Sequence, residues 1–172
     1  VALLDVDDIW HYKKLETQTK FLSNYDVVGS NCMWFGDINN VIPKIPVHDF
    51  SNFNFTEVNP IINSSCIIRK ELCHWNENGI EDYDLWLRLL ANNHIIAKIN
   101  EPLLYYRVQE NSVTQSTILK SNFFFYKAKV KFRFINKCIS KGKLNLFLVQ
   151  VSFTLLIDLI MGIAKSVKQI FR

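Results

Sequence analysis

The stretch LLDVDDIW, Leu3 to Trp10, places three aspartates directly after an apolar run near the start of the sequence. The apolar residues Val1–Leu4 predict a short buried strand, with the aspartates at its carboxyl end. Side chains alternate along an extended strand, so we expect Asp5 and Asp7 to point the same way. Two such carboxylates can hold a hard divalent cation, because Mg²⁺ commonly uses one or two carboxylates together with substrate phosphates. Acids before a helix also serve as N-caps, so the stretch alone leaves both interpretations open.

The residues that follow predict alternating helices and strands. Trp10–Asn24 has apolar residues at helical spacing, and Asp7 or Asp8 is the expected N-cap. A long loop without regular structure is expected over Asn39–Pro60. Strands are predicted at Val27–Phe35, Ser64–Arg69, Ile95–Ile99 and Leu103–Val108, the last two separated by Glu101 and Pro102. This alternation favours an α/β fold.

The segment EDYDLWLRLLANN, Glu81 to Asn93, predicts a helix most clearly. Its acidic first turn suits the positive end of the helix dipole, and its leucines recur at helical spacing. We expect Trp86 and Leu89 to be core residues. Arg88 is four residues after Asp84 and is expected to pair with it or with Asp82.

Composition bounds the class of protein. The 172 residues are 49% hydrophobic with a net charge of +4, which favours one globular domain over a disordered chain. Acidic residues lie mainly in the first 110 positions, and basic residues dominate after Lys120. The four cysteines are widely spaced without a C-x-x-C pair, so neither a disulfide framework nor a zinc cluster is indicated.

The last third of the chain has a different amino-acid composition. NFFFYKAKVKFRFINK, from Asn122, mixes aromatic and basic residues, and the stretch after Lys143 is mostly apolar. In that stretch polar side chains form one helical stripe: Gln150, Thr154, Asp158, Lys165 and Lys168. The uncharged run Leu144–Ile157 has 14 residues, fewer than the roughly 20 that span a bilayer. Either an interfacial membrane helix or a helix packed against another protein fits this pattern.

Three stretches in order carry a family resemblance: LLDVDDIW, then NGIEDYDLWLRLL from Asn78, then PLLYYRVQENSVTQS from Pro102. Together they resemble the GT-A glycosyltransferases of family 2, which use nucleotide sugars. The resemblance implies a partial GT-A domain, a Rossmann-like nucleotide-diphospho-sugar transferase fold, over residues 1–116. A basic, aromatic and apolar helical tail over residues 117–172 would follow it.

The resemblance also implies roles for particular residues. Asp5 and Asp7 correspond to the family's D-x-D, which holds Mg²⁺ or Mn²⁺, and Asp5 also contacts the donor. Asp82 corresponds to the catalytic base, with Glu81 as its neighbour or substitute. Arg107 and Gln109 correspond to the donor-binding YR motif and to a position two residues on. Many relatives have histidine at that last position, so glutamine puts its contact with metal or diphosphate in doubt.

The implied activity is inverting, metal-dependent transfer of a sugar from a nucleotide-diphospho-sugar to a polysaccharide or lipid-linked acceptor, in cell-surface glycan synthesis. We expect a location at the cytoplasmic face of a membrane, with peripheral contact through residues 120–172. No nucleic-acid module surrounds the basic stretch, so no nucleic-acid partner is expected. Family members carry a nucleotide-binding segment before the D-x-D. We therefore expect this sequence to be the C-terminal part of a longer enzyme, with little activity alone.

Two alternatives stay open from the sequence. The first is a non-catalytic glycosyltransferase-like relic or a membrane-bound interaction module. The second is a phosphatase of the haloacid-dehalogenase type, which also opens with a strand and D-x-D. In this chain Ile9 lacks the hydroxyl that such a motif carries at its fifth position, which disfavours the phosphatase.

Overall fold

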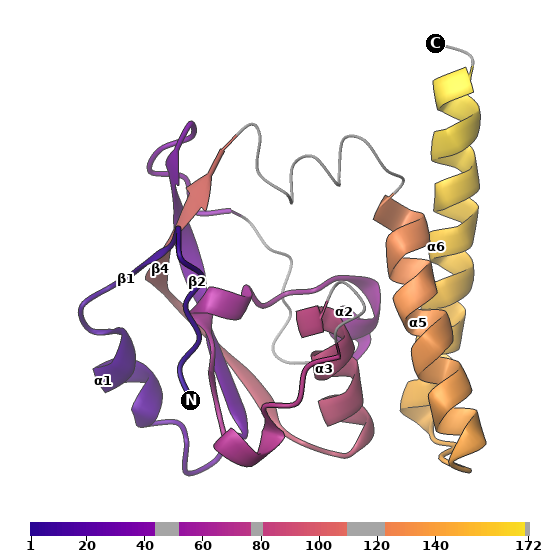
Figure 1. Cartoon of the computed structure of the whole chain (residues 1–172), viewed down its shortest axis with the longest axis horizontal. Helices are drawn as coiled ribbons and strands as arrows, with labels where there is room; N and C mark the ends of the chain where they lie inside the picture. Colours follow the sequence, from indigo (N-terminus) through magenta and orange to yellow (C-terminus); the bar gives the residue numbers. More distant parts are fainter. Residues whose placement is uncertain (44–51, 77–80, 110–122, 171–172) are drawn as a thin grey trace.

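A computed structural model describes residues 1–43, 52–76, 81–109 and 123–170. Within them, one mixed sheet has the strand order β1-β4-β2-β3 (Figure 1). β2 and β4 are parallel neighbours, and β1 and β3 pair antiparallel at either side. The strands are β1 (Ile9–Trp10), β2 (Val27–Gly36), β3 (Ile67–Ile68) and β4 (Ile96–Val108). The expected α/β class, with helices at the C-terminal end, is confirmed.

The helices form layers beside this sheet. In Figure 1, α1 lies on one side, and α2 and α3 lie between the sheet and a hairpin of α5 and α6. The α-helices are α1 (Lys14–Thr19), α2 (Asn52–Glu57), α3 (Glu81–Ala91), α5 (Phe123–Ser140) and α6 (Leu146–Ile170). Two 3₁₀ turns, η1 (Asn63–Ser65) and η2 (Lys70–Leu72), flank β3. The predicted helix from Glu81 is therefore confirmed; it ends at Ala91, and Asn93 in the turn that follows adopts a left-handed φ of 62°.

The two strands predicted around Glu101 and Pro102 are one strand, β4. Pro102 is accommodated because the register between β2 and β4 shifts there: Ser30 pairs with Ile99, and Asn31 pairs with Pro102. Asn31 fills the irregularity by donating its side-chain amide to the carbonyl of Asn100 at 2.7 Å. A proline lacks the ladder donor, so a bulge is one of the few places where a strand tolerates it.

The first helix is shorter than predicted and buries another face. It spans Lys14–Thr19, its N-cap position is Lys13, and neither Asp7 nor Asp8 caps it. Tyr12 is 84% exposed, whereas Lys14 and Gln18 are fully buried. Gln18 explains this inversion, because its amide donates to the carbonyls of Val28 and Ser65 at 2.9 and 2.8 Å. Hydrogen bonds to β2 and η1, not apolar periodicity, set the orientation of α1.

Two further expectations need correction. Val1–Leu4 is extended but forms only an isolated bridge, between Ala2 and Ile67, and Val1 and Leu4 are exposed. The predicted strand Ser64–Arg69 is reduced to β3, because Ser64 and Ser65 belong to η1. The predicted loop Asn39–Pro60 contains α2 in its described part, and residues 44–51 of it lie outside the described residues.

The hairpin packs on α3 through a continuous apolar core. That core runs from Val27 and Ile96 in the sheet, through Trp86 and Leu89 in α3, to Phe134 in α5. The assignment of Trp86 and Leu89 to the core is therefore confirmed. The hairpin is thus attached to the rest of the fold by the same apolar contacts that hold the sheet and α3 together.

The middle of the polar stripe of α6 faces inward, whereas Lys168 at its end is exposed. Thr154 and Asp158 are 1% and 3% exposed, and Asp158 lies 2.8 Å from Lys127 and 2.7 Å from Lys131 of α5. The opposite side of α6 is apolar and exposed. By length and composition, Leu146–Gln169 is apolar enough to cross a membrane, with one third of its most apolar window buried in the protein.

Lys14 carries an energetic cost that a substitution should reveal. Its ammonium group is buried above the Trp10 ring, 4.8 Å from the centroid, without a hydrogen-bond partner among the described residues. Burial lowers the pKa of Lys14 from 10.5 to about 8. A shift of that size opposes folding by about 3 kcal/mol at neutral pH. We therefore expect Lys14→Met to raise the free energy of unfolding by about 1 to 3 kcal/mol at pH 7.

The pH dependence separates this explanation from a general packing effect. The folded protein releases the Lys14 proton near pH 8, before the unfolded chain does, so the wild-type penalty shrinks between about pH 8 and 10.5. The stability gap between Lys14→Met and wild type should narrow over that range in urea unfolding. Cysteine and tyrosine side chains also ionise in this pH range, but they affect the stability of both proteins equally, so the difference between the two proteins is independent of them. A gap that stays constant with pH would contradict the assignment.

Candidate active site

An open pocket of about 290 Å³ lies at the N-terminal end of α3. The described residues that line it are Asp5, Asn63, Trp75, Glu81 and Asp82. The structure thus brings together the first aspartate of D-x-D and the acidic pair, although 76 positions separate Asp5 from Glu81 in the chain. Three carboxylic acids and an aromatic ring around one opening suit a polar, hydroxyl-rich ligand.

The D-x-D stretch is a tight turn and not the extended strand that the sequence predicts. The amide of Asp8 donates to the carbonyl of Asp5 at 3.2 Å, which closes the turn through Val6 and Asp7. The 3₁₀ turn η1 fixes its position, because the hydroxyl of Ser64 accepts a hydrogen bond from the amide of Asp5 at 3.0 Å. The turn, and not an extended strand, therefore places the Asp5 side chain at the pocket.

Asp8 anchors this turn to β4. Its carboxylate accepts a hydrogen bond from the amide of Arg107 at 2.9 Å, while its other oxygen is buried without a partner among the described residues. Burial raises the pKa of Asp8, and the nearby carboxylates of Asp7 and Asp5 add to the rise, against hydrogen bonds from Ser64 and Arg107. The three aspartates therefore interact at one turn, with Asp8 as the structural member.

Asp82 has the environment of a proton acceptor. Asn59 donates to its Oδ2 at 2.6 Å, and the amide of Tyr83 donates to its Oδ1 at 2.8 Å. Burial raises the pKa of Asp82, and the charge of Asp5 raises it further, against those two hydrogen bonds. A raised pKa moves a carboxylate toward the working pH, where a general base is most effective. Glu81, in contrast, is exposed at the pocket rim.

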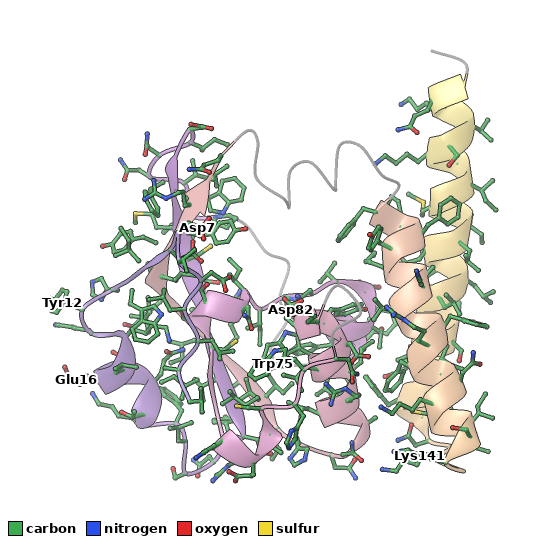
Figure 2. The ribbon with its side chains drawn as sticks, viewed as in Figure 1. Asp7, Tyr12, Glu16, Trp75, Asp82 and Lys141 are labelled. Carbon is green, nitrogen blue, oxygen red and sulfur yellow. The ribbon has the colours of Figure 1, made fainter. Side chains whose placement is uncertain are left out.

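Three residues of this site were missed by the sequence analysis: Asn59, Asn63 and Trp75. Trp75 is half-buried beside Asp82 (Figure 2), and an aromatic face of this kind can stack on a sugar ring. The Oδ1 of Asn63 is buried and lacks a partner among the described residues, so it can accept a hydrogen bond from a ligand hydroxyl. A tryptophan in a polar stretch just before an acidic helix was the available clue.

The other predicted site residues do not line this pocket. Asp7 is exposed on the turn, at the upper part of the sheet in Figure 2. The guanidinium of Arg107 lies 4.4 Å from the centre of the Phe35 ring, and its Nε donates to the carbonyl of Asp7 at 3.0 Å. Gln109 is exposed directly after β4. Arg107 therefore braces the turn from the side of β4.

The residues meet the needs of a divalent cation in part. Among the described residues, no group of three or more His, Cys, Asp or Glu side chains has the arrangement of a metal site. The turn nevertheless offers hard oxygen donors, Asp5 and Asp7, and both act electrostatically on Asp8. Mg²⁺ needs only one or two carboxylates when a substrate supplies phosphate oxygens. Asp5 and Asp7 thus supply two of the oxygen donors that a cation shared with a phosphorylated substrate would need.

Comparison with known proteins gives one similarity of note. A Methanocaldococcus jannaschii protein named as an uncharacterized glycosyltransferase is 30% identical over 139 residues, covering 73% of this chain and 48% of that protein. The chain spans about half the length of the curated relative that it matches. No protein-family model matches the chain, and no solved structure matches it. The similarity supports a glycosyltransferase relationship.

Proposed function

We propose that this chain forms the metal-binding and acceptor-binding part of an inverting glycosyltransferase of the family 2, GT-A type. The observation that carries the proposal is the shared pocket of Asp5, Glu81 and Asp82. The glycosyltransferase name of the Methanocaldococcus protein supports the same class. The donor would be a nucleotide-diphospho-sugar, and the acceptor a polysaccharide or lipid-linked glycan.

Each residue then has a chemical role. Asp82 accepts the proton of the attacking acceptor hydroxyl, which is the task that its buried, hydrogen-bonded carboxylate suits. Trp75 and Asn63 orient the acceptor sugar beside it. Asp5 and Asp7 would hold Mg²⁺ or Mn²⁺. When bound, that cation supplies neutralising charge to the diphosphate leaving group.

Single displacement by a hydroxyl inverts the anomeric carbon. The acceptor oxygen forms a bond to that carbon as the bond to the diphosphate oxygen breaks, and Asp82 takes the hydroxyl proton. Arg107 holds the D-x-D turn against β4 through its amide and its Nε, so it acts as a positioning residue. Gln109, on the same side, would contact the donor.

A transfer assay on the complete gene product tests the function. Incubation with radiolabelled UDP-, GDP- and dTDP-sugars and a membrane-lipid extract should give a labelled glycan with one donor class. Chelation with EDTA should lower the rate by about a hundredfold or more, since a cation contributes several kcal/mol to charge stabilisation, and Mn²⁺ or Mg²⁺ should restore it. Full activity in EDTA would refute the cation; no transfer from any donor would favour the relic or interaction module.

We also propose that α6 holds the protein at the cytoplasmic surface of an anionic membrane. Its exposed side is apolar over its length; Val149, Phe153 and Ile160 are 63%, 57% and 64% exposed. Residues 123–172 carry ten Lys and Arg and a single acid, Asp158, which is buried. An apolar face with surplus positive charge suits a lipid boundary with anionic headgroups.

Replacing Phe153 and Ile160 together by glutamate should abolish this contact. Each side chain contributes about 1.5 kcal/mol or more when buried, so vesicle binding should fall about a hundredfold or more. Flotation with phosphatidylglycerol-containing vesicles measures it. The matched control, Tyr12→Glu with Leu15→Glu, makes the same charge change at the start of α1 and just before it, where both side chains are exposed. Equal loss in both variants would show that charge alone, and not the α6 face, governs binding.

A further inference from the structure

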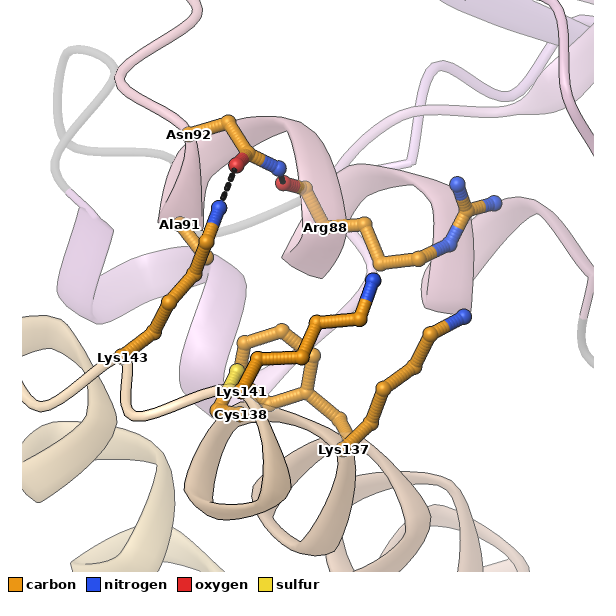
Figure 3. A pocket seen from close by; sticks show the side chains of 8 residues that line it. Arg88, Ala91, Asn92, Lys137, Cys138, Lys141 and Lys143 are labelled. Carbon is orange, nitrogen blue, oxygen red and sulfur yellow. Dashed lines mark hydrogen bonds between the residues drawn. The ribbon is translucent and has the colours of Figure 1, made fainter.

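A second pocket lies at the opposite end of α3 from Asp82. It has a volume of about 200 Å³ and lies between the end of α3 and the turn that joins α5 to α6 (Figure 3). The described residues that line it are Arg88, Ala91, Asn92, Phe134, Lys137, Cys138, Lys141 and Lys143. Asp82 and Ala91 are separated along α3 by a rise of about 14 Å, so the two pockets are distinct.

Four cationic side chains surround this pocket, and none of the described residues that line it is acidic. Arg88 pairs with Asp84 at 2.8 Å, and Lys143 donates to the side chain of Asn92. The ammonium groups of Lys137 and Lys141 have no ion-pair or hydrogen-bond partner among the described residues. Figure 3 shows both lysines extending toward α3. At least two positive charges therefore face the opening without compensation.

Helix ends do not account for these charges. Lysines near a helix C-terminus often interact with its free carbonyls. Here backbone amides of the turns that follow the helices already bond to such carbonyls. After α3, the amide of Asn93 donates to the Leu90 carbonyl, and after α5 the amide of Gly142, which has a φ of 65°, donates to the Ile139 carbonyl. Two C-terminal dipoles together supply about one negative charge. With Asp84 they balance about two of the four cations.

The remaining charge and the pocket floor indicate the ligand. A phosphate group carries up to two negative charges, and its oxygens match the donors of arginine and lysine. The floor is apolar, because Phe134 and Cys138 are 3% and 8% exposed and Ala91 lies beside them. We propose that this pocket binds a phosphate group, carried either by a soluble phosphorylated compound or by a phospholipid headgroup. The proposal does not depend on sugar transfer.

Titration of the 172-residue chain with inorganic phosphate tests the proposal. At constant ionic strength, set with chloride, phosphate should shift the amide NMR signals of residues 88–92 and 137–143 to saturation. Lys137→Gln with Lys141→Gln should weaken this binding about tenfold or more, because two charge-assisted contacts are lost. Lys129→Gln with Lys168→Gln, a matched loss of two exposed lysines on the same hairpin, should change it less than about twofold. Lys141→Arg keeps the positive charge and should still bind phosphate, so it shows whether substitution at this position disturbs the fold.

Vesicles distinguish the two sources of phosphate. If a phospholipid headgroup occupies the pocket, the Lys137/Lys141 variant should bind vesicles of phosphatidylcholine with phosphatidic acid about tenfold more weakly than the Lys129/Lys168 variant. If the ligand is soluble, both variants should bind vesicles equally, and only the Lys137/Lys141 variant should lose affinity for inorganic phosphate. Shifts that never saturate, or an equal loss of phosphate binding in both variants, would overturn the proposal, because diffuse positive charge would then explain the data.

Discussion

Replacing Asp82 with asparagine is expected to lower sugar transfer by about 10²- to 10⁴-fold, the usual contribution of a general base. Asparagine keeps the shape of the side chain and can still accept the hydrogen bond from the Tyr83 amide. Binding of the nucleotide sugar should therefore change little. A rate measured at saturating donor in the complete gene product, together with the donor dissociation constant, separates these effects.

The raised pKa of Asp82 makes a second measurement informative. Burial disfavours the ionised carboxylate, so the pKa of this base moves toward neutral pH. In the wild type, kcat/KM should fall on the acid side with an inflection above the ordinary aspartate value of 3.8. The control Asp84→Asn removes the same charge from the same helix turn and should retain transfer. Unimpaired transfer by Asp82→Asn would rule out this base.

Replacing Asp158 with asparagine should destabilise the hairpin by about 3 to 5 kcal/mol. The carboxylate is 3% exposed and lies within 2.8 Å of two ammonium groups, those of Lys127 and Lys131, and Lys131 is fully buried. Removing one member of a buried ion cluster leaves the others uncompensated, and that loss has this size. Urea unfolding and hydrogen exchange of the α5 and α6 amides measure it.

Two controls separate the ion cluster from general effects of mutation. Asp84→Asn breaks the partly exposed pair with Arg88 and should cost about 1 kcal/mol or less. The triple change Lys127→Met, Lys131→Met and Asp158→Leu removes all three charges and should recover most of the stability, because buried ion clusters are often replaceable by apolar residues. If Asp158→Asn costs no more than Asp84→Asn, the cluster does not hold the hairpin together.

The sequence predicted those helices and strands in which the regularly spaced apolar residues are also the ones that are buried in the structure. β2 and α3 were placed within two residues at each end, since long periodic segments with clear end signals are dominated by local preference. The ion pair of Arg88 with Asp84 was also predicted, because it depends only on helical spacing. Such features need no knowledge of distant contacts.

Several of the failures depend on contacts between residues far apart in the sequence, many of them polar. The orientation of α1 depends on bonds from Gln18 to Val28 and Ser65, which helical periodicity cannot reveal. The D-x-D turn depends on a hydrogen bond to the side chain of Ser64. Trp75 and Asn63 reach the pocket through the fold alone. Asp5 and the acidic pair were placed at one site because the family resemblance links their two motifs, although the residues are far apart in the sequence.

Paramagnetic broadening by Mn²⁺ tests the central claim most directly, namely that Asp5 and the Glu81–Asp82 pair face one metal-dependent cleft. Mn²⁺ added with pyrophosphate to the isotopically labelled chain should broaden the amide signals of residues 5–8 and 81–83 together, and Asp5→Asn with Asp7→Asn should remove both effects. Mg²⁺ serves as the diamagnetic control. Broadening confined to one of the two segments, or found only elsewhere in the chain, would contradict the shared site.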